Sequence, residues 1–157
     1  MKKTTFIFGL ALLMLVSIGW ECSVTTAGLS EIKFAKDKEG KQAATAGDTG
    51  KDIYALVDAT GIPSGKHKIQ WKVTYDNVAG KTKGEGFAEV KPMEFEGSAQ
   101  LWTQFTPSLP GDYKVEATLS DSTGKTIATK SSNIKVTGSA PSAPATSDDK
   151  KSDDEDK

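Results

Sequence analysis

Few residues of this chain have side chains whose type and spacing could support catalysis or metal binding. His67 is the single histidine, so a cluster of histidines around a metal ion is impossible. Its lysine neighbours predict a surface position at the start of a strand. Glu94 and Glu96 are two residues apart, so a strand would place both on one face, but nothing in the sequence indicates an acid-catalysis pocket around them.

The motifs of nucleophilic, phosphate-binding and redox sites are also missing. The sequence contains no GxSxG, no phosphate-binding loop and no CxxC. The acidic ending DDEDK could attract calcium weakly, but it lacks the glycine and the spaced ligands of a dedicated loop. We therefore expect no catalytic, cofactor-binding or metal-binding residue. An enzyme would require a carboxylate site that the sequence does not reveal.

Charge composition argues against a nucleic-acid partner. All 20 basic residues are lysines, and the chain has no arginine. Dedicated phosphate and nucleic-acid sites usually use the planar guanidinium group, which forms two parallel hydrogen bonds.

One aromatic residue could carry recognition. Trp102 lies between Gln100 and Gln104 on the strand face opposite Leu101 and Phe105. An exposed tryptophan of this kind anchors protein partners or stacks on sugar rings. The alternative is that Trp102 covers a second hydrophobic layer or a loop.

A row of lysines is the second candidate for partner binding. Lys68, Lys72 and Lys114 fall on polar faces of predicted strands. Such a stripe could meet an acidic partner or the acidic end of this chain. The alternative is that the lysines only keep a sheet soluble.

The first 27 residues have the layout of a secretory signal peptide. Lys2 and Lys3 precede an apolar run of 15 residues, 6–20, and a polar stretch follows that ends with Thr25, Thr26 and Ala27, where Thr25 and Ala27 supply small side chains at the two positions that the peptidase inspects. A membrane-spanning helix needs about 20 apolar residues, so a stable span is the weaker interpretation. We expect cleavage after Ala27, with Gly19 as the alternative, and export to the periplasm or the cell exterior.

Cys22, the single cysteine, raises the question of a lipid anchor. A lipobox has a small residue just before the cysteine and usually a leucine three residues before it, whereas this chain has Glu21 and Gly19 there. We therefore expect no lipidation. Cleavage after Ala27 would leave a mature chain without cysteine and without a disulfide.

Residues 138–157 are predicted to form a disordered acidic tail. The segment has six acidic residues, three lysines and no large apolar side chain. Without apolar side chains to bury, the segment gains no free energy that could offset the loss of conformational entropy on ordering. We interpret it as a solvated terminus, with a docking tail as the alternative.

Residues 28–137 alternate between apolar and polar side chains with turn residues at regular intervals, which predicts strands and no helix. The clearest alternation is in 66–76, and Pro92 indicates an edge strand or a strand break. A turn at 121–124 leads into the last strand. The predicted strands cover 31–34, 52–59, 66–76, 85–96, 99–105, 109–119 and the stretch that ends at 136.

The segment 109–113, LPGDY, resembles the tyrosine corner of fibronectin type III and related immunoglobulin-like domains, whose tyrosine hydroxyl bonds to the backbone upstream. Trp71 lies where such domains often have a core tryptophan. The resemblance covers residues 29–137 and implies an all-β, immunoglobulin-like (fibronectin type III-like) antiparallel β-sandwich of about seven strands without a disulfide. Trp71 and Tyr113 would then be structural core residues.

A shared fold carries no function by itself. We expect an exported, non-enzymatic interaction or accessory module that binds a protein partner at the cell envelope or outside the cell. The alternative is a carbohydrate-binding module of the cell envelope, which would present several coplanar aromatic rings; Trp102 and Tyr54 are the residues that the sequence offers for this.

Overall fold

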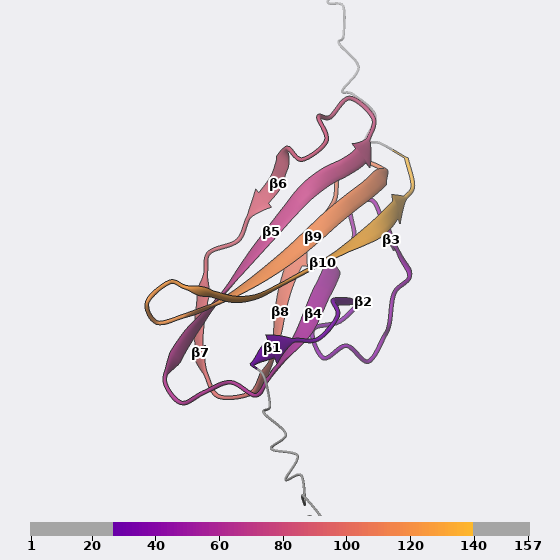
Figure 1. The fold of residues 1–157 in the computed structure, drawn as a ribbon. Coiled ribbons are helices and arrows are strands. Elements are labelled where there is room, and N and C mark those ends of the chain that lie inside the picture. The colour runs from indigo at the N-terminus through magenta and orange to yellow at the C-terminus, as the bar shows by residue number, and fades with distance from the viewer. Residues whose placement is uncertain (1–26, 140–157) are drawn as a thin grey trace, which may run out of the picture.

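The computed structural model describes residues 27–139, which form ten strands and no helix. The strands build two sheets that face each other (Figure 1). The all-β, immunoglobulin-like sandwich predicted from the sequence is confirmed. Of the predicted signal peptide (1–27) only Ala27, and of the predicted tail (138–157) only Gly138 and Ser139, are among the described residues; Cys22 lies outside them.

The smaller sheet is built around β4 (Ile53–Thr60). On one side, β8 (Ala99–Phe105) pairs antiparallel with β4 along its length. On the other side, two short strands pair with successive parts of β4, namely β1 (Gly28–Leu29) and β2 (Lys33–Ala35). The smaller sheet is therefore only three strands wide.

The larger sheet contains the long strands. Its centre is β9 (Gly111–Asp121), between β5 (Lys66–Val78) and β10 (Thr126–Thr137). At one edge, β3 (Ala46–Asp48) pairs with β10. At the other edge, β6 (Gly86–Glu89) and β7 (Met93–Glu96) pair with different parts of β5.

The strand prediction is corrected at the edges of the sheets. Residues 85–96 form two strands, β6 and β7, because Pro92 interrupts the pairing, as its missing N–H predicts. The strands β1 and β3 were not expected. The pairing is also not wholly antiparallel: β3 runs parallel to β10, because the chain crosses from the smaller to the larger sheet between β2 and β3.

The buried face of each sheet is set by the period-two alternation. For β4, where the sequence left the inward face open, the structure places Ile53, Ala55 and Val57 in the core. Trp71 is 2% exposed, and its indole nitrogen has no hydrogen-bond partner among the described residues. Tyr113 is fully buried at the centre of the larger sheet.

The Tyr113 hydroxyl donates a hydrogen bond to the backbone oxygen of Leu109 at 2.8 Å, which is the contact that defines a tyrosine corner. Burial raises the pKa of this hydroxyl. The ring of Tyr113 also contacts Tyr75, Phe87 and Phe105.

His67 is not the surface residue that its lysine neighbours predicted; only 4% of it is exposed. It is in phase with Ile69 and Trp71, so its side chain faces inward. Phe95 of β7 pairs with it and covers the ring, with ring centroids 6.1 Å apart. The Nδ1 atom lies 3.0 Å from the carbonyl oxygen of Gly65.

We expect Trp71→Ala to lower the free energy of unfolding by about 3–5 kcal/mol, because it leaves a large cavity in the core. Trp71→Phe should lower the free energy of unfolding by less than Trp71→Ala does, because it removes the unpaired indole N–H together with only part of the ring. Urea denaturation of both variants checks this order. A Trp71→Ala variant as stable as the wild type would contradict the buried placement.

Tyr113→Phe should lower the free energy of unfolding by about 1–2 kcal/mol, because the carbonyl of Leu109 loses its hydrogen-bond donor while the ring stays packed. The same denaturation experiment measures this difference, with Tyr54→Phe as the matched control. An equal loss in the control would show that the corner hydrogen bond contributes nothing.

Candidate interaction surface

Trp102 lies on the outer face of the smaller sheet and is 41% exposed. Its neighbour on that face is Tyr54 of β4, with ring centroids 5.8 Å apart and planes tilted by 60°. The pairing register explains the contact, because Trp102 is opposite Leu56 and Tyr54 is opposite Gln104, which makes the two rings diagonal neighbours. Tyr54, Gln100, Trp102 and Gln104 are called the Trp102 face below.

The polar connection between β2 and β3 covers the adjoining part of this outer face. Leu56 points outward but is only 3% exposed, because Gly40 in the connection approaches it closely: a Cβ atom on Gly40 would lie 3.2 Å from the Leu56 Cδ2 atom. The carboxylate of Asp37 accepts hydrogen bonds from the N–H groups of Lys41 and Gln42 and so organises the turn. The connection thus covers Leu56, whereas Trp102 stays accessible beside it.

The backbone of β8 is paired on one side only. The backbone of Asp58 in β4 bonds to Ser30, away from β8: its carbonyl accepts from the Ser30 N–H at 2.9 Å, and its N–H donates to the Ser30 Oγ at 2.9 Å. Alternate residues of an antiparallel strand bond to opposite neighbours. Odd-numbered residues of β4 therefore bond to β8.

The register of β4 and β8 identifies the unpaired backbone groups of β8. The odd residues of β4 are opposite 99, 101, 103 and 105. The N–H and C=O groups of Gln100, Trp102 and Gln104 must then point away from β4, and no hydrogen bond joins them to another part of residues 27–139. We call these backbone groups the open edge; sequence analysis did not single them out.

The predicted lysine row lies on the outer face of the larger sheet, but carboxylates are interspersed with it. The Lys68 Nζ atom is 3.4 Å from a carboxylate oxygen of Glu94, and the Lys114 Nζ atom is 3.7 Å from one of Glu116. Lys72 is opposite Glu116 in the register. The row is therefore not a uniformly positive stripe.

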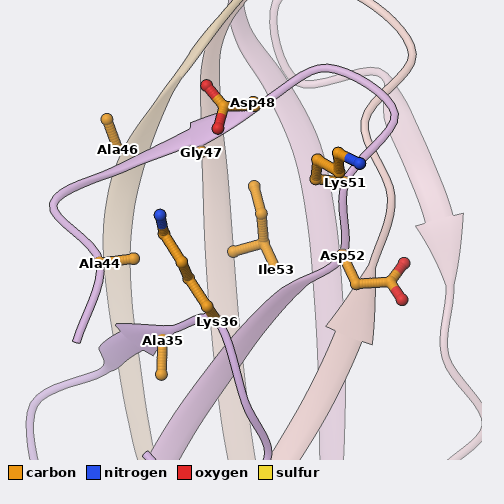
Figure 2. A pocket seen from close by; sticks show the side chains of 9 residues that line it. All are labelled: Ala35, Lys36, Ala44, Ala46, Gly47, Asp48, Lys51, Asp52 and Ile53. Carbon is orange, nitrogen blue, oxygen red and sulfur yellow. The ribbon is translucent and has the colours of Figure 1, made fainter. Parts of the chain in front are cut away.

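A pocket of about 340 Å³ opens where the chain crosses between the sheets (Figure 2). Alanines and the side chain of Ile53 form its apolar part, and Figure 2 shows Lys36 extending beside Ile53 while Asp52 points away. The four charged lining residues are all exposed; they are Lys36, Asp48, Lys51 and Asp52. None of the buried polar residues of 27–139 is among its lining residues.

In residues 27–139, no three histidine, cysteine, aspartate or glutamate side chains come together as a metal site would require. Among the same residues, no helix has the length and hydropathy needed to cross a bilayer.

No protein-family model matches this chain, and no curated protein matches it. Solved structures with a similar fold include the CARDB domain of a Pyrococcus furiosus protein in complex with di-metal ions, with 15% identity, a TM-score of 0.48, and coverage of 72% of this chain and 89% of that one.

Two further solved structures are similar at lower identity. The PKD domain of an M14-like peptidase from a Thermoplasmatales archaeon has 11% identity, a TM-score of 0.45, and coverage of 71% and 96%. A Niemann-Pick type C2 protein from the Japanese carpenter ant has 11% identity, a TM-score of 0.46, and coverage of 74% and 96%. None of these similarities bears on what this chain binds.

The open edge predicts an alternating pattern of amide hydrogen exchange along β8. The amides of Gln100, Trp102 and Gln104 should exchange rapidly, whereas those of Leu101 and Thr103 should be protected by β4. Hydrogen exchange followed by NMR on the full chain measures this. Equal protection of all five amides would show that the edge is already paired.

Proposed function

We propose that this protein is an exported, non-enzymatic interaction module that binds a protein partner at the cell envelope or outside the cell through the Trp102 face. The observation that carries the proposal is the exposure of Trp102 on a rigid strand, with Tyr54 packed beside it. A large aromatic side chain held in place this way loses little conformational entropy on binding and is typical of the residues that dominate interface energies.

A protein partner suits this surface better than a glycan. Sugar binding by stacking favours aromatic rings that share a plane, whereas Trp102 and Tyr54 are tilted by 60°. Gln100 and Gln104 add uncharged donors and acceptors on both sides of the indole. Asp58, opposite Gln100 on the same face, lies 3.7 Å from the Lys33 amine, whereas β8 itself has no charged residue. An uncharged strand with an aromatic centre resembles the core of a protein interface, where charged residues are depleted.

The polar side chains support a non-enzymatic role. His67 is buried against Phe95, with its Nδ1 atom at the carbonyl of Gly65. Glu94 shares the outer face of β7 with Glu96, and its carboxylate lies within 4.0 Å of the amines of Lys66 and Lys68. Export is supported by the signal-like layout of the first 27 residues.

The Trp102 face is tested by photo-cross-linking in the native cell, with p-benzoylphenylalanine at Gln100 of the full exported chain. We expect a discrete protein adduct that Trp102→Ala reduces at least tenfold, since truncation of a central aromatic anchor typically costs about 2 kcal/mol or more. Lys135→Ala is the matched control: Lys135 is exposed in β10 on the other sheet, and its substitution should leave the adduct unchanged.

Circular dichroism and a thermal melt of each variant establish that the fold is retained. An adduct insensitive to Trp102→Ala, or the absence of any protein adduct, would overturn the proposal. Binding to a glycan array that Trp102→Ala abolishes would replace it with the carbohydrate-binding alternative.

A further inference from the structure

The two sheets differ in width, and the difference exposes an apolar surface beside β8. The larger sheet continues past β5 to β6 and β7, whereas the smaller sheet ends at β8. Met93 of β7 pairs with Ile69, so it faces the core side of its sheet. It is nevertheless 40% exposed, although Ile69 is fully buried. No strand of the smaller sheet covers it.

The edge strands β6 and β7 lie alongside β8 at both of its ends. At the start of β8, only Gly97 and Ser98 separate it from β7. At its end, Phe105 contacts Phe87 of β6, with ring centroids 6.2 Å apart. The half-buried Phe87 and Phe95 and the exposed Met93 therefore form an apolar shelf next to the open edge.

Other sheet edges carry the features that discourage strand addition, whereas β8 does not. The β6–β7 edge contains Lys91, Pro92 and a register shift opposite Val73 and Thr74. The part of β10 that β3 does not cover contains Lys130 and a register shift between Thr126 and Ala128, and β1, β2 and β3 are only two or three residues long. The seven residues of β8, AQLWTQF, include no charge and no proline. Charges, prolines, irregularities and short length are how natural sheets block pairing with other chains.

We propose that an extended segment of the protein partner adds to β8 as a further strand of the smaller sheet. Gln100, Trp102 and Gln104 offer alternating N–H and C=O groups, about six in all, and an extended main chain is the ligand that matches this pattern. Side chains on one face of the added strand cover Met93 and Phe95, and those on the other face flank Trp102. This inference rests on the proposed function in that the partner is a protein.

The geometry also defines the partner segment. It has at least five extended residues, apolar side chains at alternate positions facing the shelf, and no proline at its centre. The tail of this chain does not fit, because residues 140–157 lack a large apolar side chain. A second copy fits poorly, because the larger sheet of each copy extends past β8 toward the other.

A pair of substitutions at Gln104 separates backbone recognition from side-chain recognition. Gln104→Pro removes an N–H that does not bond to β4, so the fold should survive, whereas Gln104→Ala keeps this N–H and removes only the side chain. The probe is a phage-displayed library of random heptapeptides selected on the immobilised full chain. We expect enriched peptides with alternating apolar residues, which bind Gln104→Pro at least about tenfold more weakly than Gln104→Ala, because both variants lack the amide side chain and only the proline variant lacks the N–H.

A second measurement keeps the test decisive if the proline variant does not fold. Methylation of backbone nitrogens in a selected peptide should abolish binding at every second central residue and spare the residues between, because only alternate N–H groups face β8. On peptide binding, the amides of Gln100, Trp102 and Gln104 should become protected from hydrogen exchange.

Several results would overturn the inference. One is that the selected peptides show no alternation of apolar residues, and another is that their binding changes neither with Gln104→Pro nor with methylation of their backbone. A third is that the amides of Gln100, Trp102 and Gln104 are already protected from hydrogen exchange in the free chain. A fourth is that the chain sediments as a dimer which Gln104→Pro dissociates. If the cellular adduct is lost in Trp102→Ala but kept in Gln104→Pro, strand addition is wrong and the proposed function stands. If no adduct forms although peptides bind the edge, the proposed function fails instead.

Discussion

The contact of Tyr113 with Phe87 and Phe105 is the interaction on which the rest of the structure depends. Tyr113 belongs to the centre of the larger sheet, Phe87 to its edge and Phe105 to the last strand of the smaller sheet, and the three ring centroids lie 5.2 to 6.4 Å apart. Aromatic rings at these distances and angles stabilise one another beyond the area they bury. This cluster holds the two sheets together at the place where the smaller sheet ends.

The crossing of the chain between β2 and β3 has two consequences for the candidate site. It gives the larger sheet a parallel edge strand, and it leads the polar connection across the outer face of the smaller sheet, where Gly40 covers Leu56. The connection lies over Leu56 of β4 and leaves Trp102 of β8 41% exposed. The exposure of Trp102 therefore follows from the path of the chain and not from its own strand.

Charge has a secondary role on this surface. Several lysines of the larger sheet lie near carboxylates, and exposed ion pairs of this kind contribute little to stability or binding. The distinctive surface is the uncharged one, where an aromatic side chain, two amides and unpaired backbone groups occur together on β8. An uncharged open edge also favours aggregation, so a partner strand would protect the protein as well as recognise it.

Much of the fold could be predicted from the sequence, because side chains on a strand alternate with a period of two. This alternation determined the all-β class, the inward positions of Trp71 and Tyr113, and the outward position of Trp102. The missing N–H of Pro92 determined the break between β6 and β7. Local chemistry also determined the turn at 121–124, where the Asp121 carboxylate accepts hydrogen bonds from Thr123 and Lys125. Each of these features depends on residues close together in the chain.

Only the tertiary structure decided what lies opposite each strand and where each sheet ends. The alternation of side chains along β5 places His67 on the inward face, but its ring is buried only because Phe95 of another strand packs against it. The exposure of Met93 and the unpaired backbone of Gln100 exist because no strand follows β8 in the smaller sheet. Such features depend on pairing between distant segments, which a pattern along one strand does not encode.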